Sequence, residues 1–99
     1  MNIQKMMKDL QRMQSKLQDE IDVMELEATA GGGAVTARMN GRKELTALTL
    51  APEAITPDDP GMMQDLILAA VNEASRKVDA EVQRMTEGIA GGLKIPGLT

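Results

Sequence analysis

The side chains with the clearest chemical potential in this sequence are four bases near its start. They recur at steps of three and four residues, and they are Lys5, Lys8, Arg12 and Lys16. Five apolar residues recur at the same spacing: Ile3, Met6, Leu10, Met13 and Leu17. On a helix, at about 100° per residue, the two sets form separate stripes on roughly opposite sides. The apolar stripe suits a protein contact, and the basic stripe suits a polyanion.

Other reactive residue types are missing or lack a partner. The absence of histidine and cysteine excludes the common zinc sites, cysteine nucleophiles and histidine-based triads, so Ser15 and Ser75 have no base to activate them. The acids that follow the bases are Asp19, Glu20, Asp22, Glu25 and Glu27. We interpret them as a solvated acidic face rather than a metal site. The sequence predicts no catalytic residue, metal site, cofactor or small-molecule substrate, and it favours a binding protein over an enzyme.

The composition is that of one small folded domain with a thin core. Hydrophobic residues make up 42% and charged residues 26% of the 99 positions, as in folded proteins. Phe, Trp and Tyr are absent, so Leu, Ile, Val, Ala and nine Met must form the core. We expect oligomerisation to compensate for the missing aromatic burial. With no membrane-length apolar run and no signal-peptide core at the start, we expect a cytoplasmic protein without a membrane partner.

Periodicity and turn signals predict an α+β fold with a small antiparallel sheet in a single domain. A helix is expected over residues 1–23, strands within 24–50, a second helix over 58–88 and a Gly/Pro tail over 89–99. The segment "VMELEATA" is ambiguous, because propensity continues the helix whereas alternation favours a strand. We expect the tail to be a partly mobile extension that folding does not require.

Asn40-Gly41 is the strongest local hairpin signal, since both positions of a two-residue turn need positive φ. This turn would place Met39 opposite Arg42 and Val35 opposite Thr46. One face of the predicted hairpin is apolar and carries Val35, Ala37, Met39, Leu48 and Leu50. The other face carries Thr36, Arg38 and Lys43, so the tip is expected to be basic.

Four segments resemble the YbaB/EbfC nucleoid-associated proteins of bacteria. These segments are "GGGAVTARMNG", "LTLAPE", "QDLILAAVNEASRKVDAEVQRM" and "GGLKIPGL". The N-terminal helix, rich in Met, Gln and Lys, is similar in character, so the resemblance runs from about Ile3 to Leu98. One departure is Ala51, a loop position where many relatives carry an acid.

The resemblance implies a fold and a role. It implies an intertwined homodimer of α-β-β-β-α subunits, with a strand around residues 24–30 and N-terminal helices that project like the arms of tweezers. It also implies a bacterial, nucleoid-associated protein that binds double-stranded DNA, alters its conformation, affects nucleoid organisation, DNA protection and gene expression, and is not an enzyme.

Ten bases are candidate DNA contacts, in three groups. The stripe of the first helix ranks first, because only Asp9 lies among its bases. The bases of the second helix rank second, and they are Arg76, Lys77 and Arg84. Glu73 stands four residues before Lys77 and Glu81 three before Arg84, so each acid can pair with its base. Arg38, Arg42 and Lys43 rank third, because bases at a hairpin also protect the strand edges from aggregation.

We expect recognition to be electrostatic and only slightly sequence-dependent. No helix-turn-helix spacing or zinc motif is present, and no aromatic residue is available to stack on bases. The alternative function is a protein-binding adaptor or chaperone-like homodimer, which would use the Met-rich stripe and the apolar tail to hold its partner.

Overall fold

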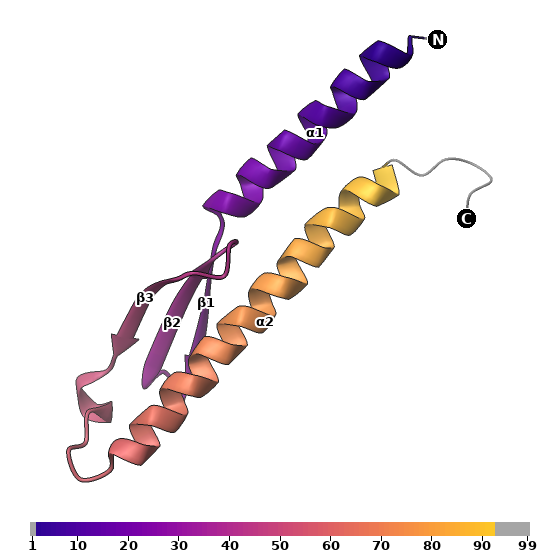
Figure 1. Ribbon diagram of the computed structural model, residues 1–99. Helices are drawn as coiled ribbons and strands as arrows, with labels where there is room; N and C mark the ends of the chain where they lie inside the picture. Colours follow the sequence, from indigo (N-terminus) through magenta and orange to yellow (C-terminus); the bar gives the residue numbers. More distant parts are fainter. Residues whose placement is uncertain (1, 93–99) are drawn as a thin grey trace.

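The computed structural model describes residues 2–92 and contains two long helices joined by a three-stranded sheet (Figure 1). The elements are α1 (Ile3–Val23), β1 (Glu25–Ala30), β2 (Val35–Asn40), β3 (Leu45–Leu50), the short 3₁₀ helix η1 (Pro52–Ala54) and α2 (Pro60–Gly92). The predicted α-β-β-β-α order and α+β class are confirmed. The strand alternative for the ambiguous segment is the correct one, because α1 ends at Val23 and Met24 is already extended.

The core lies between α2 and the first two strands. The sheet is antiparallel in the order β1-β2-β3, and α2 packs against β1 and β2. The buried residues of this core are Ala28, Val35, Ala37, Met39, Ala70, Ala74 and Val78. Ala70, Ala74 and Val78 are four residues apart and therefore share one face of α2. Because most of these side chains are small, the helix approaches the sheet closely and the core is a single thin layer.

The hairpin forms, but its predicted register is wrong. Val35 pairs with Leu50, Ala37 with Leu48 and Met39 with Leu45, with an irregularity between Arg38 and Met39. The loop is longer than the two-residue turn, since the backbone N–H of Asn40 donates to Glu44 O and that of Lys43 donates to Asn40 O. Positive φ occurs at Lys43 (64°) and not at Gly41, which is typical of a three-residue loop with a bulge. The predicted apolar face survives, because Val35 and Ala37 directly oppose Leu50 and Leu48.

The second helix begins at Pro60, two residues after the predicted start at 58, and ends later than expected. The Asp59 side chain accepts a hydrogen bond from the backbone N–H of Met62 at 3.0 Å, which caps the positive end of α2. The sequence predicted an end near Gly88, whereas α2 continues to Gly92. Residues 89–92 of the predicted tail are therefore helical, and its remainder, 93–99, lies outside the described residues.

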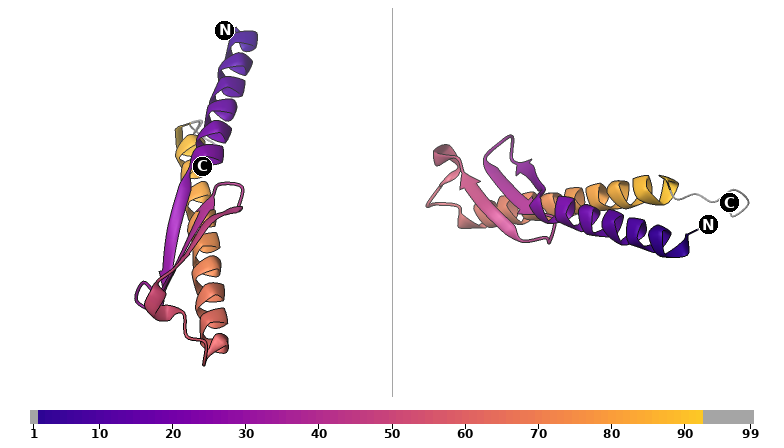
Figure 2. Two further views of the ribbon diagram at one scale, coloured as in Figure 1. Left: turned by 90° about the vertical axis from the view of Figure 1, so that its left-hand side faces the viewer. Right: turned by 90° about the horizontal axis from the view of Figure 1, so that it is seen from above.

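The first helix projects from this body as an arm. Figures 1 and 2 show α1 leaving the sheet in the same general direction as the C-terminal half of α2. The molecule measures 70 × 25 × 15 Å and its radius of gyration is 19.4 Å, against about 13 Å for a compact chain of this length. Among the residues of α1 only Ile21 is buried. The apolar stripe of the arm is consequently open in the single chain, with Ile3 67% and Met6 51% exposed.

Candidate nucleic-acid interface

The basic stripe of α1 is displayed on the exposed part of the arm. The Asn2 side chain caps the helix by accepting the Lys5 backbone N–H at 3.2 Å, so the helix is fully formed where the stripe begins. From Lys5 to Lys16 the stripe covers roughly 16 Å of helix axis, and all four bases are exposed. Asp9 stands three residues before Arg12, but no ion pair joins them.

The bases of α2 form ion pairs or hydrogen bonds with other residues of the chain. Arg76 pairs with Glu73 at 2.7 Å and Arg84 pairs with Glu81. The hydrogen bond from Arg84 lowers the pKa of Glu81 and reciprocally raises the pKa of Arg84. The sequence offered Glu73 as the partner of Lys77, and this pairing is wrong. The Lys77 Nζ instead donates to the backbone oxygen of Glu27 at 2.8 Å and ties α2 to β1.

The bases of β2 and the hairpin loop are also engaged. Arg38 donates to Glu27 across the strands and lies 3.6 Å from Glu25, and the Glu27 hydrogen bond raises the pKa of Arg38. Sequence reasoning did not find two further ion pairs that bring distant segments together. These are Arg42 with Asp22 at 3.5 Å and Lys43 with Asp79 at 3.2 Å. The predicted basic tip is therefore largely neutralised, and Lys43 lies toward α2 rather than away from it.

The ten candidate bases thus divide into two classes. Six have an acidic or backbone oxygen as partner: Arg38, Arg42, Lys43, Arg76, Lys77 and Arg84. Within residues 2–92, the four α1 bases are those with neither an ion pair nor a side-chain hydrogen bond. A base without a protein partner has both its charge and its hydrogen-bond donors available for an external anion. The arm is therefore the strongest candidate surface for a polyanion.

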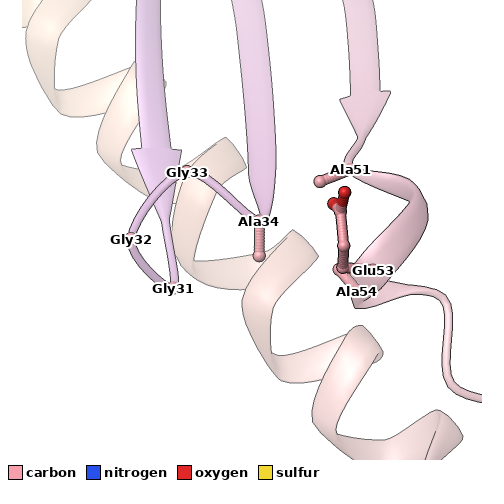
Figure 3. Close-up of a pocket in the computed structure, with 7 residues that line it drawn as sticks. All are labelled: Gly31, Gly32, Gly33, Ala34, Ala51, Glu53 and Ala54. Carbon is pink, nitrogen blue, oxygen red and sulfur yellow. The ribbon is translucent and has the colours of Figure 1, made fainter.

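A glycine-rich hollow at the other end of the sheet does not suit phosphate. About 370 Å³ in volume, it is lined by Gly31, Gly32, Gly33, Ala34, Ala51, Glu53 and Ala54 (Figure 3). A phosphate-binding loop offers backbone N–H groups and positive charge, whereas the charged side chain here is the Glu53 carboxylate. We interpret the three glycines, at φ of 65°, 67° and 96°, as the turn between β1 and β2.

The part of the chain that the structure describes has neither a metal-binding cluster nor a membrane-spanning helix. No three acidic side chains there are grouped so as to hold a metal ion. No described helix combines the length and the apolar character needed to cross a membrane.

Comparison with known proteins gives matches over nearly the whole chain. Residues 1–93 match the YbaB/EbfC DNA-binding family. A nucleoid-associated protein of Acetivibrio thermocellus is 50% identical, with 96% of this chain and 81% of that protein covered. One of Pelotomaculum thermopropionicum is 47% identical, covering 98% of this chain and 95% of the relative. The fold is similar to the crystal structure of uncharacterized protein HP0035 from Helicobacter pylori, with a TM-score of 0.72 and 22% identity over 91% of this chain and 98% of that one.

Proposed function

Since the chain belongs to the YbaB/EbfC DNA-binding family, we propose that it binds double-stranded DNA as a nucleoid-associated homodimer. The observation that carries this proposal is the basic stripe of α1, whose four bases have no partner among the described residues. Relatives that are 40–50% identical are named nucleoid-associated proteins, which supports a place in the nucleoid of the cytoplasm. The protein would bind and shape DNA rather than catalyse a reaction.

The chemistry is the exchange of condensed counterions for protein bases. Each ammonium or guanidinium group that approaches a phosphate releases a counterion, and the gain in entropy drives binding. A 21-residue helix is about 31 Å long, so the arm can lay its stripe along the phosphate backbone. No aromatic side chain is available to wedge between or stack on bases. Contacts of this kind position the protein without reading sequence, so discrimination would be slight and would follow DNA shape and flexibility.

The single chain also leaves apolar surface for a second copy. β3 is exposed along most of its length, with Leu45 46% and Leu48 41% exposed. Most of the apolar stripe of α1 is exposed as well, and exposed apolar patches are typical of interaction sites. A homodimer would bury part of this area and would present two arms. Two arms on one body could bend a duplex or bridge two of them, which would affect nucleoid organisation and gene expression.

The decisive experiment removes the stripe. Replacing Lys5, Lys8, Arg12 and Lys16 with Gln retains helix propensity, because Gln is a good helix former. If about four phosphates are neutralised, the log–log salt slope of the unaltered protein is about −3.6, and the replacement should flatten it and weaken binding by at least about a hundredfold. Fluorescence anisotropy on unrelated duplexes across a salt series measures both quantities.

A matched control changes the same helix without changing its charge. Gln11→Ala and Gln14→Ala keep all four bases and should leave affinity and salt slope unchanged. If the quadruple variant retains both the DNA affinity and the salt slope of the unaltered protein, the site is not on α1. The bases of α2 and the hairpin then become the candidates. Circular dichroism and sedimentation should show that helix content and dimer mass are retained.

The alternative is the adaptor or chaperone-like homodimer, which the exposed methionines of α1 favour. Met6 and Met7 are both more than half exposed, and flexible thioether side chains adapt to varied apolar partners. Binding to random duplex DNA at low salt, compared with binding to a panel of unfolded polypeptides, separates the two functions. An unaltered protein that bound the polypeptides and had no DNA affinity would establish the adaptor.

A further inference from the structure

The loop between β2 and β3 contacts both helices at the root of the arm. Gly41 lies against the last turn of α1. The next two residues form ion pairs with different helices, Arg42 with Asp22 of α1 and Lys43 with Asp79 of α2. Figure 1 shows the loop beside the end of α1, where the arm leaves the body. One short loop therefore joins the arm, the sheet and the second helix.

The contact at Gly41 has no room for any side chain. A Cβ atom built on Gly41 would lie 1.9 Å from the backbone oxygen of Ile21, 2.7 Å from its carbonyl carbon and 2.8 Å from its Cγ2. The first two atoms belong to the backbone, so the obstruction cannot be relieved by a change of side-chain rotamer. Because Gly41 does not have positive φ, close approach rather than backbone conformation explains glycine here. Ile21 is also the buried residue of α1.

The steric contact matters more than the neighbouring ion pairs. The Arg42 and Asp22 side chains are 63% and 27% exposed, and exposed pairs of this kind contribute little and are screened by salt. The fit of Gly41 on Ile21 does not depend on ionic strength. It consequently persists under the same salt conditions that change the strength of phosphate contacts.

We infer that Gly41 and Ile21 form a clasp that fixes the direction of the arm, and that Gly41 is a positioning residue for the basic stripe. Only Met24 separates α1 from β1, so without the clasp the arm would pivot about this residue. A pivot of about 20° would move the far end of a helix of this length by roughly 10 Å, enough to take the stripe off a phosphate track. The effect on DNA rests on the proposed function, whereas the clasp itself does not.

The clasp is tested first without DNA, by measuring where the arm points. The chain has no cysteine, so spin labels can be attached at Gln11→Cys on α1 and Gln83→Cys on α2, both exposed. Dilution with unlabelled protein leaves the distance within one chain as the measured quantity. We expect a narrow distribution in the labelled parent and a broadened or displaced one after Gly41→Ala. The matched control is Gly88→Ala, where a new Cβ meets no atom within 4 Å.

The DNA measurement then distinguishes a positioning role from loss of charge. Gly41→Ala retains every base, so the salt slope should stay unchanged, while affinity should fall about tenfold because a loosened arm must be ordered on binding. If Gly41→Ala does not fold, Ile21→Ala removes the Cγ2 contact and the buried side chain of the clasp without adding bulk, and it should broaden the distribution to a smaller extent. An unchanged distribution in the variant that folds overturns the clasp. A broadened distribution in a protein with no DNA affinity would retain the clasp and overturn the proposed function.

Discussion

Both long helices carry bases, four on α1 and three on α2, yet the structure gives those bases different surroundings. On α2, Glu73 and Glu81 stand three residues before Arg76 and Arg84, and each forms an ion pair with its arginine. On α1, the four bases have no such partners within the described chain. The number of bases on a helix therefore does not identify a polyanion site. A better indicator is whether acids at i−3 or i−4 form ion pairs with those bases.

The acids that are scarce near the start of α1 are found at its C-terminal end and in the adjoining strand β1. Asp22 forms an ion pair with Arg42, and both Glu25 and Glu27 form ion pairs with Arg38. Three of the five acids in the run that follows the basic stripe therefore pair with bases of the hairpin and not with the stripe. Separation along the arm leaves the outer part positive in a chain whose net charge is −4. The local surface, rather than the net charge, decides where a polyanion binds.

The difference between the two helices should disappear if α1 is given acids that can pair with its bases, as α2 has. Gln4→Glu, Gln11→Glu and Ser15→Glu place an acid three or four residues from Lys8 and Arg12. Such pairs neutralise part of the stripe, so we expect DNA affinity to fall more than about tenfold and the salt slope to flatten. Fluorescence anisotropy measures both. Replacing the same three residues with Ala is the control and should change neither quantity, and equal losses in both variants would contradict the electrostatic explanation.

The reverse change should have a smaller effect. Glu73→Gln and Glu81→Gln remove the partners of Arg76 and Arg84 and leave both guanidinium groups free. If α2 lies beside the bound duplex, we expect affinity to rise a few-fold and the salt slope to steepen. Glu53→Gln in η1 and Asp58→Asn in the loop before α2 also remove two acids, and they control for the change in net charge. An equal rise in the control would show that overall charge, and not release of the arginines, is responsible.

Local features of this fold could be predicted from sequence, and contacts between distant segments could not. Helical periodicity located α1 and α2, and the Glu81–Arg84 pair follows from spacing within one helix. The hairpin register failed because Asn40-Gly41 indicated a two-residue turn. In the structure the Asn40 side chain accepts hydrogen bonds from the backbone N–H groups of Arg42 and Glu44. This arrangement stabilises a longer loop with Lys43 at positive φ.

The partners of the hairpin bases were beyond sequence reasoning for the same reason. Arg42 and Asp22 are 20 residues apart, and Lys43 and Asp79 are 36 apart. No periodic signal links positions at such separations. Gly41 was recognised as necessary, but for the wrong cause, since its role depends on the approach of Ile21 from α1. Sequence reasoning anticipated which bases would share a face, and which would be paired, only where a single helix contained all the members.

The smallest expected effect concerns acid and the Glu81–Arg84 pair. The hydrogen bond from Arg84 lowers the pKa of Glu81 below its usual value near 4.5. A lowered pKa in the folded state means that the pair contributes stability above the unfolded pKa and loses it as pH falls through the folded one. At neutral pH, Glu81→Gln should therefore lower Tm slightly, because the pair is exposed and such pairs contribute little.

The difference in Tm between the two proteins, followed by circular dichroism from neutral pH into strong acid, should shrink to nothing once Glu81 is protonated. A difference that stayed constant throughout would show that packing of the side chain, and not its charge, stabilises this turn of α2. Among residues 2–92 the α1 bases have no carboxylate partner to protonate, so acid should release no corresponding charge on the arm.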